Sequence, residues 1–285
     1  MNIQAFLFRK VFARSDAKRD KGLSIPEDIE YISSLPYGAG LTLDVCYPKG
    51  TSAKRPTIVS FHGGGFVYGD AKLYSLYAAS LAGRGFTVVN FNYRLAPDFK
   101  FPAPLLDASD VMRWMCANDD RYYIDLENVF FVGDSAGAQL ASQFAAICSS
   151  REYADIMGIA QPGIKLRAIA LNCGMYDLQR AAAAGGLMEC YFTDDPAQFG
   201  RKLDVMNYID ANYPPAFVMS AHGDFLCDEC GPMGAFLRSR GVETISVIYG
   251  DKSTGHVFHC DMRSEIGRKA NDDEAKFFMR HVKSE

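Results

Sequence analysis

The feature that most constrains this 285-residue chain is the run Gly133–Gly137, which reads Gly-Asp-Ser-Ala-Gly. It joins an apolar, strand-like segment at 128–132 to an alanine-rich, helical segment at 136–148. Small residues on both sides of a serine allow a tight strand–turn–helix bend, which holds the hydroxyl exposed and strained. The run therefore predicts Ser135 as a nucleophile. The alternative is an ordinary serine that caps the first turn of a helix.

A second motif lies upstream, where three glycines follow a short apolar stretch. Residues 57–61 lead into His62, Gly63, Gly64 and Gly65. Glycines leave their backbone N–H groups unobstructed, so a negatively charged oxygen can approach them closely. A flexible loop and a phosphate cradle are alternatives, although no Gly-Lys-Ser/Thr follows to complete a phosphate-binding loop. Together with the serine run, the glycine run favours an oxyanion hole.

Several motifs in one fixed order give the chain a family resemblance that is more specific than any single motif. They are His-Gly-Gly-Gly at 62–65, Asn-Tyr-Arg-Leu-Ala-Pro-Asp at 92–98, Gly-Asp-Ser-Ala-Gly at 133–137, His-Gly-Asp-Phe-Leu at 222–226 and Gly-His-Val-Phe at 255–258. On these residues the chain resembles the hormone-sensitive-lipase-like esterases of the α/β-hydrolase fold, in their bacterial branch. The resemblance covers roughly residues 40–260.

Three residues that each follow a strand-like stretch make a catalytic set. They are Ser135, Asp224 and His256. In open α/β sheets, ligands bind at the carboxyl ends of the strands, and the chain order Ser, Asp, His is the one found in α/β-hydrolases. We therefore expect Ser135 to attack an ester carbonyl, His256 to take the proton and Asp224 to orient the imidazole.

A second histidine competes with His256 for the role of the base. Of the five histidines, His62 belongs to the glycine run, His222 precedes the expected acid and His281 lies near the terminus. That leaves His256 and His259. The residues around His256 match the histidine loop of the family, and we therefore expect His256 to be the base.

Two further aspartates compete with Asp224 for the role of the acid. Asp228 fits the first turn of the following helix, where the helix dipole favours a carboxylate. Asp177 precedes a stretch expected to belong to the cap. Asp224 occupies the position of the family's acid, although the proline that often follows that acid is replaced by Phe225 in this chain.

The resemblance also implies which groups bind the oxyanion. The backbone N–H groups of Gly64, Gly65 and Ala136 are expected to do so, because Ala136 follows the nucleophile at the start of a helix. In the family, the histidine at the position of His62 shapes this turn, and Gly63 belongs to the same motif.

Alternating strands and helices predict the fold class. We expect strands at 29–33, 41–47, 57–61, 87–93, 128–132, 166–171, 216–221 and 244–249, most of them separated by helical stretches. This alternation implies a mostly parallel sheet with helices on both faces. The resemblance implies an eight-stranded α/β-hydrolase fold with a small helical cap. With 48% apolar residues, the chain can bury one sizeable core, so we expect a single domain at 1–285.

Two stretches, at 1–25 and 178–213, are expected to form the cap. The first contains a helical face, and the family places this region over the active site. A helix lying on a membrane surface is the alternative, but its polar face is weakly basic. A signal peptide is not expected, since the basic residues follow the apolar run instead of preceding it. The helical face carries Ile3, Phe6, Leu7 and Val11.

Composition and charge exclude several other classes of protein. The net charge of -4 and the absence of a long basic run leave no electrostatic footprint for nucleic acid. No stretch approaches the ~20 apolar residues of a membrane span. Eight scattered cysteines without a secretion signal indicate reduced thiols and a cytoplasmic protein. Cys227 and Cys230 form a lone pair without further ligands at zinc-site spacing, so we expect no metal and no cofactor.

The sequence therefore predicts a serine carboxylesterase that acts on small, short-chain acyl esters. The alternatives are an amidase or aryl-formamidase, whose members tend to have another residue at the position of Gly65, and a non-catalytic binding module, which usually lacks the triad. A long-chain lipase is disfavoured by the mean hydropathy of -0.08. The strand at 244–249 is a candidate contact for a homodimer if that strand lies at the edge of the sheet.

Overall fold

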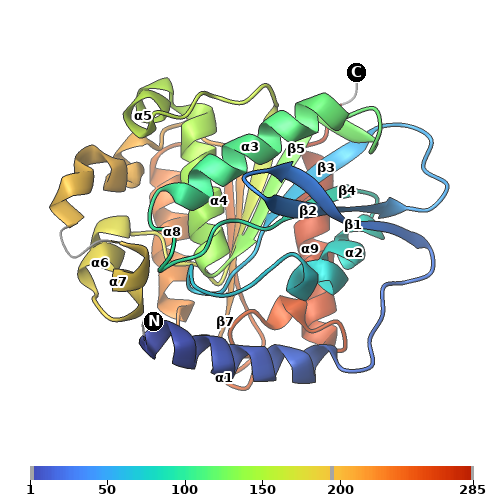
Figure 1. Ribbon diagram of the computed structural model, residues 1–285, viewed down its shortest axis with the longest axis horizontal. Helices are drawn as coiled ribbons and strands as arrows, with labels where there is room; N and C mark the ends of the chain where they lie inside the picture. Colours follow the sequence, from blue (N-terminus) through green and yellow to red (C-terminus); the bar gives the residue numbers. More distant parts are fainter. Residues whose placement is uncertain (1–2, 193–195, 284–285) are drawn as a thin grey trace.

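The computed structural model describes residues 3–192 and 196–283, which build a central sheet surrounded by helices (Figure 1). Within the described residues the sheet has eight strands. In spatial order they are β1 (Ile29–Gly38), β2 (Leu41–Pro48), β4 (Thr87–Phe91), β3 (Arg55–Phe61), β5 (Ile124–Asp134), β6 (Leu166–Asn172), β7 (Ala216–Ala221) and β8 (Thr244–Tyr249). The pairs β1–β2 and β2–β4 are antiparallel, and the other neighbours are parallel.

Helices cover both faces of this sheet (Figure 1). One face packs against α3 (Ala103–Asn118), α4 (Ala136–Ser149), α5 (Arg151–Met157) and α8 (Cys227–Ser239). The other face packs against α2 (Ser75–Ala82) and α9 (Glu265–Arg280). The architecture is the mostly parallel α/β sheet that the sequence predicts, and that expectation is confirmed.

The central strands β4 and β7 are largely apolar because both of their faces are buried. All five residues of β4 are buried. In β5, Val129 and Phe131 belong to one core, whereas Phe130 and Val132 belong to the other. This alternation follows from the two-residue period of a strand. The paired cores hold the strand ends in place, and the strand ends carry the candidate site.

The remaining elements connect the sheet or lie beside its carboxyl edge. They are α1 (Ile3–Asp20), η1 (Lys72–Tyr74), α6 (Leu178–Ala183), α7 (Leu187–Tyr191), η2 (Pro196–Leu203), η3 (Val205–Tyr208) and η4 (Phe258–Cys260). Residues 1–2 and 193–195 of the two expected cap stretches, and 284–285 of the expected domain, lie outside the described residues. None of the helices in the described part of the chain is both long and apolar enough to cross a bilayer.

The strands predicted at 216–221 and 244–249 have the observed bounds, and the other six predicted strands differ in extent from the observed ones. The differences at the first and the fourth predicted strand have a local explanation. The first continues beyond residue 33 because a bulge at Ser34, with φ of 62°, lets pairing resume at Leu35. The Ser34 N–H donates to the Asp44 carboxylate at 2.9 Å, which satisfies the group that the bulge removes from the ladder. The strand predicted at 87–93 ends at Phe91, where its parallel partner β3 also ends at Phe61.

The helical face predicted for the N-terminal segment points the wrong way. Three of its members, Ile3, Leu7 and Val11, are 71%, 56% and 64% exposed. The opposite side of α1 faces the protein instead, with Phe8 and Phe12 lining an internal cavity. Both sides of this helix are apolar, so residue spacing alone cannot choose the buried side.

A polar anchor explains which side of α1 is turned inward. The Arg9 guanidinium donates to the carbonyl oxygens of Val67 at 2.7 Å and Ala96 at 3.0 Å. These two carbonyls belong to loops that follow β3 and β4. The anchor therefore places α1 over the carboxyl ends of the strands (Figure 1).

Candidate active site

Ser135 lies in the bend between β5 and α4, with φ of 52° and ψ of -119°. This conformation is costly for a residue with a side chain, by about 1–3 kcal/mol, and such strain gathers at functional sites. Ser135 occupies the N-cap position of α4, but its side chain makes no capping hydrogen bond. A Cβ at Gly137 would overlap the Phe61 carbonyl oxygen, so the close approach of α4 to β3 requires glycine there. The geometry is that of an elbow and departs from an ordinary capping serine.

The glycine loop lies beside this bend. Gly64 has φ of 121° and Gly65 has φ of 59°, and both line the same cavity as Ser135. Within the described part of the chain, no protein group accepts a hydrogen bond from the N–H of Gly64, Gly65 or Ala136. Ala136 also stands at the first position of α4, where the helix dipole is positive. These three donors are the ones that the sequence predicts for an oxyanion hole.

His62 and Tyr93 fix the start of the glycine loop. His62 is fully buried, and its Nδ1 lies 2.8 Å from the Gly63 carbonyl oxygen. The Tyr93 ring stacks on the imidazole at 4.0 Å, and its hydroxyl donates to the His62 carbonyl oxygen at 2.8 Å. Burial lowers the pKa of His62 to about 4, so its ring is neutral at pH 7. His62 thus packs behind the loop and does not line the cavity.

A hydrogen-bond chain ties the glycine loop to the serine bend. The Gly63 N–H donates to the Tyr74 hydroxyl at 3.0 Å, and that hydroxyl donates to Asp134 Oδ2 at 2.7 Å. Burial raises the pKa of Asp134 to about 7, against the opposing effect of the Tyr74 hydrogen bond. Sequence reasoning missed Tyr74, although a buried aspartate next to the nucleophile is a sign that such a partner exists.

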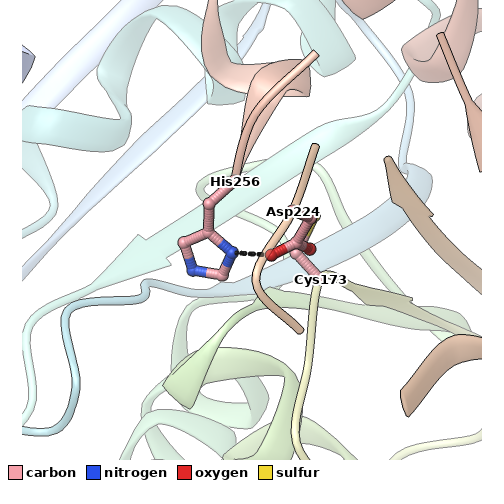
Figure 2. A group of neighbouring side chains, drawn as sticks. All are labelled: Cys173, Asp224 and His256. Atoms are coloured by element: carbon pink, nitrogen blue, oxygen red, sulfur yellow. Dashed lines mark hydrogen bonds and ion pairs between the residues drawn. The ribbon is translucent and has the colours of Figure 1, made fainter. Parts of the chain in front are cut away.

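The side chains of His256 and Asp224 point toward each other (Figure 2). His256 Nδ1 lies 2.7 Å from Asp224 Oδ1. The carboxylate also accepts from the Leu226 N–H at 2.9 Å and from the Ser220 hydroxyl at 2.7 Å. Burial acts to raise the pKa of Asp224, but the hydrogen bonds and the charge of His256 outweigh it and hold that pKa below its usual value. The carboxylate is thus ionised and aimed at the imidazole.

The backbone around His256 is also strained. Val257, directly after it, has φ of 52°, an unusual conformation for a β-branched residue. Ser135 and His256 line one cavity, yet no hydrogen bond joins their side chains among the described residues. Such bonds are often long in the absence of substrate and shorten when it binds.

Cys173 is the third side chain beside this pair (Figure 2). Its sulfur, an Asp224 oxygen and a His256 nitrogen lie within 4.8 Å of one another, which makes them the set that could hold a metal ion. Burial, followed by the charge of Asp224, raises the pKa of the Cys173 thiol well above its usual value. His256 Nδ1 is already joined to Asp224 Oδ1 at 2.7 Å, so the three side chains make a hydrogen-bonded acid–base pair with a thiol beside it.

The contacts of Cys227 and Cys230 indicate a packing role for this pair of cysteines. Cys227 and Cys230 lie in the first turns of α8, and the chain's cysteines are free thiols. The Cys230 thiol donates to the carbonyl oxygens of Val218 and Val247, each at 3.6 Å. These contacts pack α8 against β7 and β8.

The structure separates the rival residues from the cavity. His259 is fully buried, and its two ring nitrogens have no hydrogen-bond partner among the described residues. Burial lowers the pKa of His259 to about 3. Asp228 lies in the first turn of α8, as predicted. Asp177 caps α6 by accepting from the Arg180 N–H at 2.9 Å. None of these three residues lines the cavity.

The cavity has a volume of about 250 Å³ and two kinds of wall. The first, which we name the strand-end wall, comes from loops that follow strands and consists of Gly63, Gly64, Gly65, Asp134, Ser135, Ala136, Phe225, Leu226, His256 and Val257. The second, the helical cover, comes from α1 and α7 and consists of Phe8, Phe12, Asp16, Arg19, Leu187 and Met188. A Cβ at Gly65 would lie 2.8 Å from Leu187 and 3.2 Å from Phe8, so the cover rests directly on the glycine loop.

Known proteins resemble this chain in sequence and in structure. It is 27% identical to an acetyl esterase of Salmonella typhi over 272 residues, which cover 88% of this chain and 79% of that protein. Esterase B of Lactobacillus rhamnosis superposes with a TM-score of 0.88 at 23% identity, over 98% and 96% of the two chains. An esterase of the archaeon Pyrobaculum calidifontis superposes with a TM-score of 0.77 at 26% identity, over 98% and 92%.

A family profile described as α/β hydrolase fold matches residues 58–260, more than two thirds of the chain. The matched region contains the glycine loop, the serine bend, Asp224 and His256. The chain therefore belongs to the hormone-sensitive-lipase-like carboxylesterase family of the α/β-hydrolase fold.

Proposed function

We propose that this protein is a serine carboxylesterase that hydrolyses short-chain acyl esters through an acyl-enzyme. The observation that carries the proposal is the shared cavity. It contains the strained Ser135, the unengaged N–H groups of the glycine loop, and His256 bound to Asp224 at 2.7 Å. Nucleophile, base and oxyanion donors in one site are the parts that acyl transfer requires.

In the first half of the reaction, Ser135 Oγ attacks the ester carbonyl carbon while His256 Nε2 takes its proton. Asp224 holds the imidazole in the tautomer with the proton on Nδ1 and stabilises the imidazolium. The negative charge on the carbonyl oxygen is bound by the N–H groups of Gly64, Gly65 and Ala136. Removing one such donor typically costs about 3 kcal/mol in other enzymes.

The tetrahedral intermediate then collapses. The bond from the carbonyl carbon to the alcohol oxygen breaks, and His256 gives its proton to that oxygen, so the alcohol leaves and the acyl group remains on Ser135. In the second half, His256 takes a proton from water, whose oxygen attacks the acyl carbon. The bond from the acyl carbon to Ser135 Oγ then breaks, and His256 returns its proton to Oγ, so the carboxylic acid leaves and the Ser135 hydroxyl is restored.

The size of the cavity supports short acyl groups. A volume of about 250 Å³ lies below the usual 300–1,000 Å³ range of small-molecule sites. Each buried methylene contributes at most about 0.8 kcal/mol, so transition-state binding stops improving once the acyl chain outgrows the cavity. The Salmonella relative is named an acetyl esterase, which agrees with a small acyl group.

The architecture of the protein around the site completes the proposal. We infer that residues 1–285 form one domain in which the stretches 1–25 and 178–213 supply the cap, because α1 and α7 cover the cavity. β8 lies at one edge of the sheet, and a homodimer through that edge is part of the proposal.

A panel of p-nitrophenyl esters from acetyl to decanoyl tests the proposed function, with an anilide and a formyl-amide as controls. We expect kcat/KM to be highest between acetyl and hexanoyl and to fall for longer chains. Faster hydrolysis of the anilide or the formyl-amide would assign an amidase or aryl-formamidase instead. No turnover of any compound would indicate a binding module.

A further inference from the structure

Phe225 is a large aromatic residue in an unusual position. It is 72% exposed, yet it lines the catalytic cavity. Its ring centroid lies 4.3 Å from that of His256, with the ring planes at 41°. Single exposed apolar residues are common on protein surfaces, but this one combines exposure with contact to the catalytic imidazole.

The backbone holds Phe225 at the tip of a tight turn. The Asp224 N–H donates to the Ala221 carbonyl oxygen at 3.0 Å, and the Cys227 N–H donates to the Asp224 carbonyl oxygen at 3.0 Å. The Leu226 N–H is bound by the Asp224 side chain at 2.9 Å. The same residue that orients His256 thus fixes the position of the Phe225 backbone. The ring is preorganised beside the imidazole and does not need to be ordered by a ligand.

The reaction geometry decides which part of an ester meets this ring. His256 must come within about 2.6–3.2 Å of the departing alcohol oxygen in order to protonate it. The first carbons of the alcohol therefore lie against the imidazole and against Phe225, which flanks it. The acyl chain extends from the carbonyl carbon, whose oxygen points to the N–H groups of Gly64 and Gly65. The helical cover, which contacts Gly65, lies on that side.

We propose that Phe225, together with its half-buried apolar neighbours Leu226 and Val257, forms an alcohol-binding subsite that selects esters of aromatic alcohols. The inference rests on the proposed esterase function and names its substrate class. A flat aromatic group can stack offset on an exposed phenyl face, or meet it edge to face, and such pairs are stronger than burial of area alone. A saturated ring of the same size gains burial but not the aromatic geometry.

The test compares three acetate esters whose acyl group is constant: benzyl, cyclohexylmethyl and ethyl acetate. Benzyl and cyclohexylmethyl alcohols are similar in size, so the pair isolates the aromatic contact. In the wild-type enzyme, we expect kcat/KM for benzyl acetate to exceed that for cyclohexylmethyl acetate by about threefold to tenfold. Phe225→Ala and Phe225→Leu should lower kcat/KM for benzyl acetate about threefold to tenfold more than kcat/KM for ethyl acetate or cyclohexylmethyl acetate, and so remove this preference. Phe225→Tyr should keep the preference.

A matched control is Phe99→Ala, which removes an exposed phenyl ring that packs over Arg94 and does not line the cavity. It should leave all three esters unchanged. Circular dichroism of each variant checks that the fold is retained, which is expected because Phe225 is largely exposed.

Three results would overturn the subsite. An equal loss on all three esters in Phe225→Ala would show that the ring only supports His256. Hydrolysis of ethyl acetate by the wild type with no preference for benzyl acetate would reject the subsite and leave the esterase function standing. Absence of hydrolysis of every ester by the wild type would reject the esterase function and the subsite with it.

Discussion

The strand-end wall and the helical cover enclose the same cavity but are built in different ways. The strand-end wall is fixed by strained backbone at Ser135 and Val257 and by a buried hydrogen-bond chain from the Gly63 N–H through the Tyr74 hydroxyl to the Asp134 carboxylate. The helical cover is fixed by side chains. Phe8 and Phe12 stack at 4.2 Å between centroids, and Arg9 anchors the helix to two carbonyl oxygens.

Chemistry and selectivity are thus divided between the two walls. Ser135 and Asp224, two of the groups proposed to react, follow β5 and β7, whose final residues are buried on both faces of the sheet, so their positions follow from the core of the fold. The groups proposed to choose the acyl chain are held by a surface helix that a few contacts attach. The reacting groups of the strand-end wall and their oxyanion donors should tolerate almost no change, whereas the helical cover should tolerate many changes that alter specificity.

The largest effect is expected from the acid–base pair of the strand-end wall. His256→Ala and Asp224→Asn should each lower kcat by ~10⁴ or more, because members of a triad act as a unit. Ester hydrolysis with p-nitrophenyl butyrate provides the measurement. His259→Ala and Asp228→Asn are the controls and should stay within about tenfold of the wild type. A damaging Asp228→Asn with an active Asp224→Asn would reverse the assignment of the acid.

A smaller effect on kcat is expected from loss of the Tyr74 hydroxyl, which joins the glycine loop to the serine bend. Tyr74→Phe leaves the Gly63 N–H without its acceptor and the buried Asp134 without its donor, and each such loss costs about 1–3 kcal/mol. We expect kcat to fall by about tenfold or more with little change in KM. Tyr68→Phe is the matched control, because it removes a 2.9 Å hydrogen bond to Asp16 in the helical cover. Equal losses of kcat in the two variants would contradict the division between the walls.

The sequence predicts the strand-end wall better than the side chains that support it. Glycines and the serine of the strand-end wall are required by local backbone geometry, so short motifs reveal them, and β7 and β8 have the predicted bounds. The partners of those motifs come from distant elements. Tyr74 precedes α2, and Cys173 follows β6, and no local pattern links either residue to the site.

The orientation of α1 shows what local patterns cannot decide. Its sequence is apolar on both sides, and the inward side is selected by Arg9, whose acceptors lie 58 and 87 residues away. Spacing predicts the helix correctly and its buried face wrongly, since Ile3, Leu7 and Val11 are exposed. Tertiary contacts between distant segments therefore determine the shape of the cover.

The helical cover should control the response to acyl length. Phe12→Ala removes a ring that lines the cavity, and the added space can bury further methylenes of the substrate at up to about 0.8 kcal/mol each. We expect the ratio of kcat/KM for octanoyl over butanoyl esters to rise about threefold or more. Val11→Ala, on the exposed side of the same helix, should leave the ratio unchanged. An unchanged ratio in Phe12→Ala would show that the acyl chain does not reach α1.

Replacement of His259 should have the smallest effect on activity. It should, however, change how the free energy of unfolding depends on pH. The pKa of His259 is lowered from 6.5 to about 3 by burial, so the folded protein holds it neutral. A depressed pKa of this kind stabilises the fold fully above pH 6.5, and this contribution is lost as the pH falls toward 3. Between pH 6.5 and 5, His259→Leu should therefore lose less free energy of unfolding than the wild type, by up to about 1.4 kcal/mol per pH unit. Urea denaturation at several pH values provides the measurement, and identical slopes would contradict the assignment.

We assign the role of nucleophile to Ser135, at the bend between β5 and α4. Covalent labelling with a p-nitrophenyl alkylphosphonate, followed by peptide mass spectrometry of the labelled chain, tests this assignment most directly. We expect one equivalent of label on Ser135, loss of ester hydrolysis in step with labelling, and neither labelling nor activity in a folded Ser135→Ala variant. Label on another residue, or activity near that of the wild type in Ser135→Ala, would contradict this assignment.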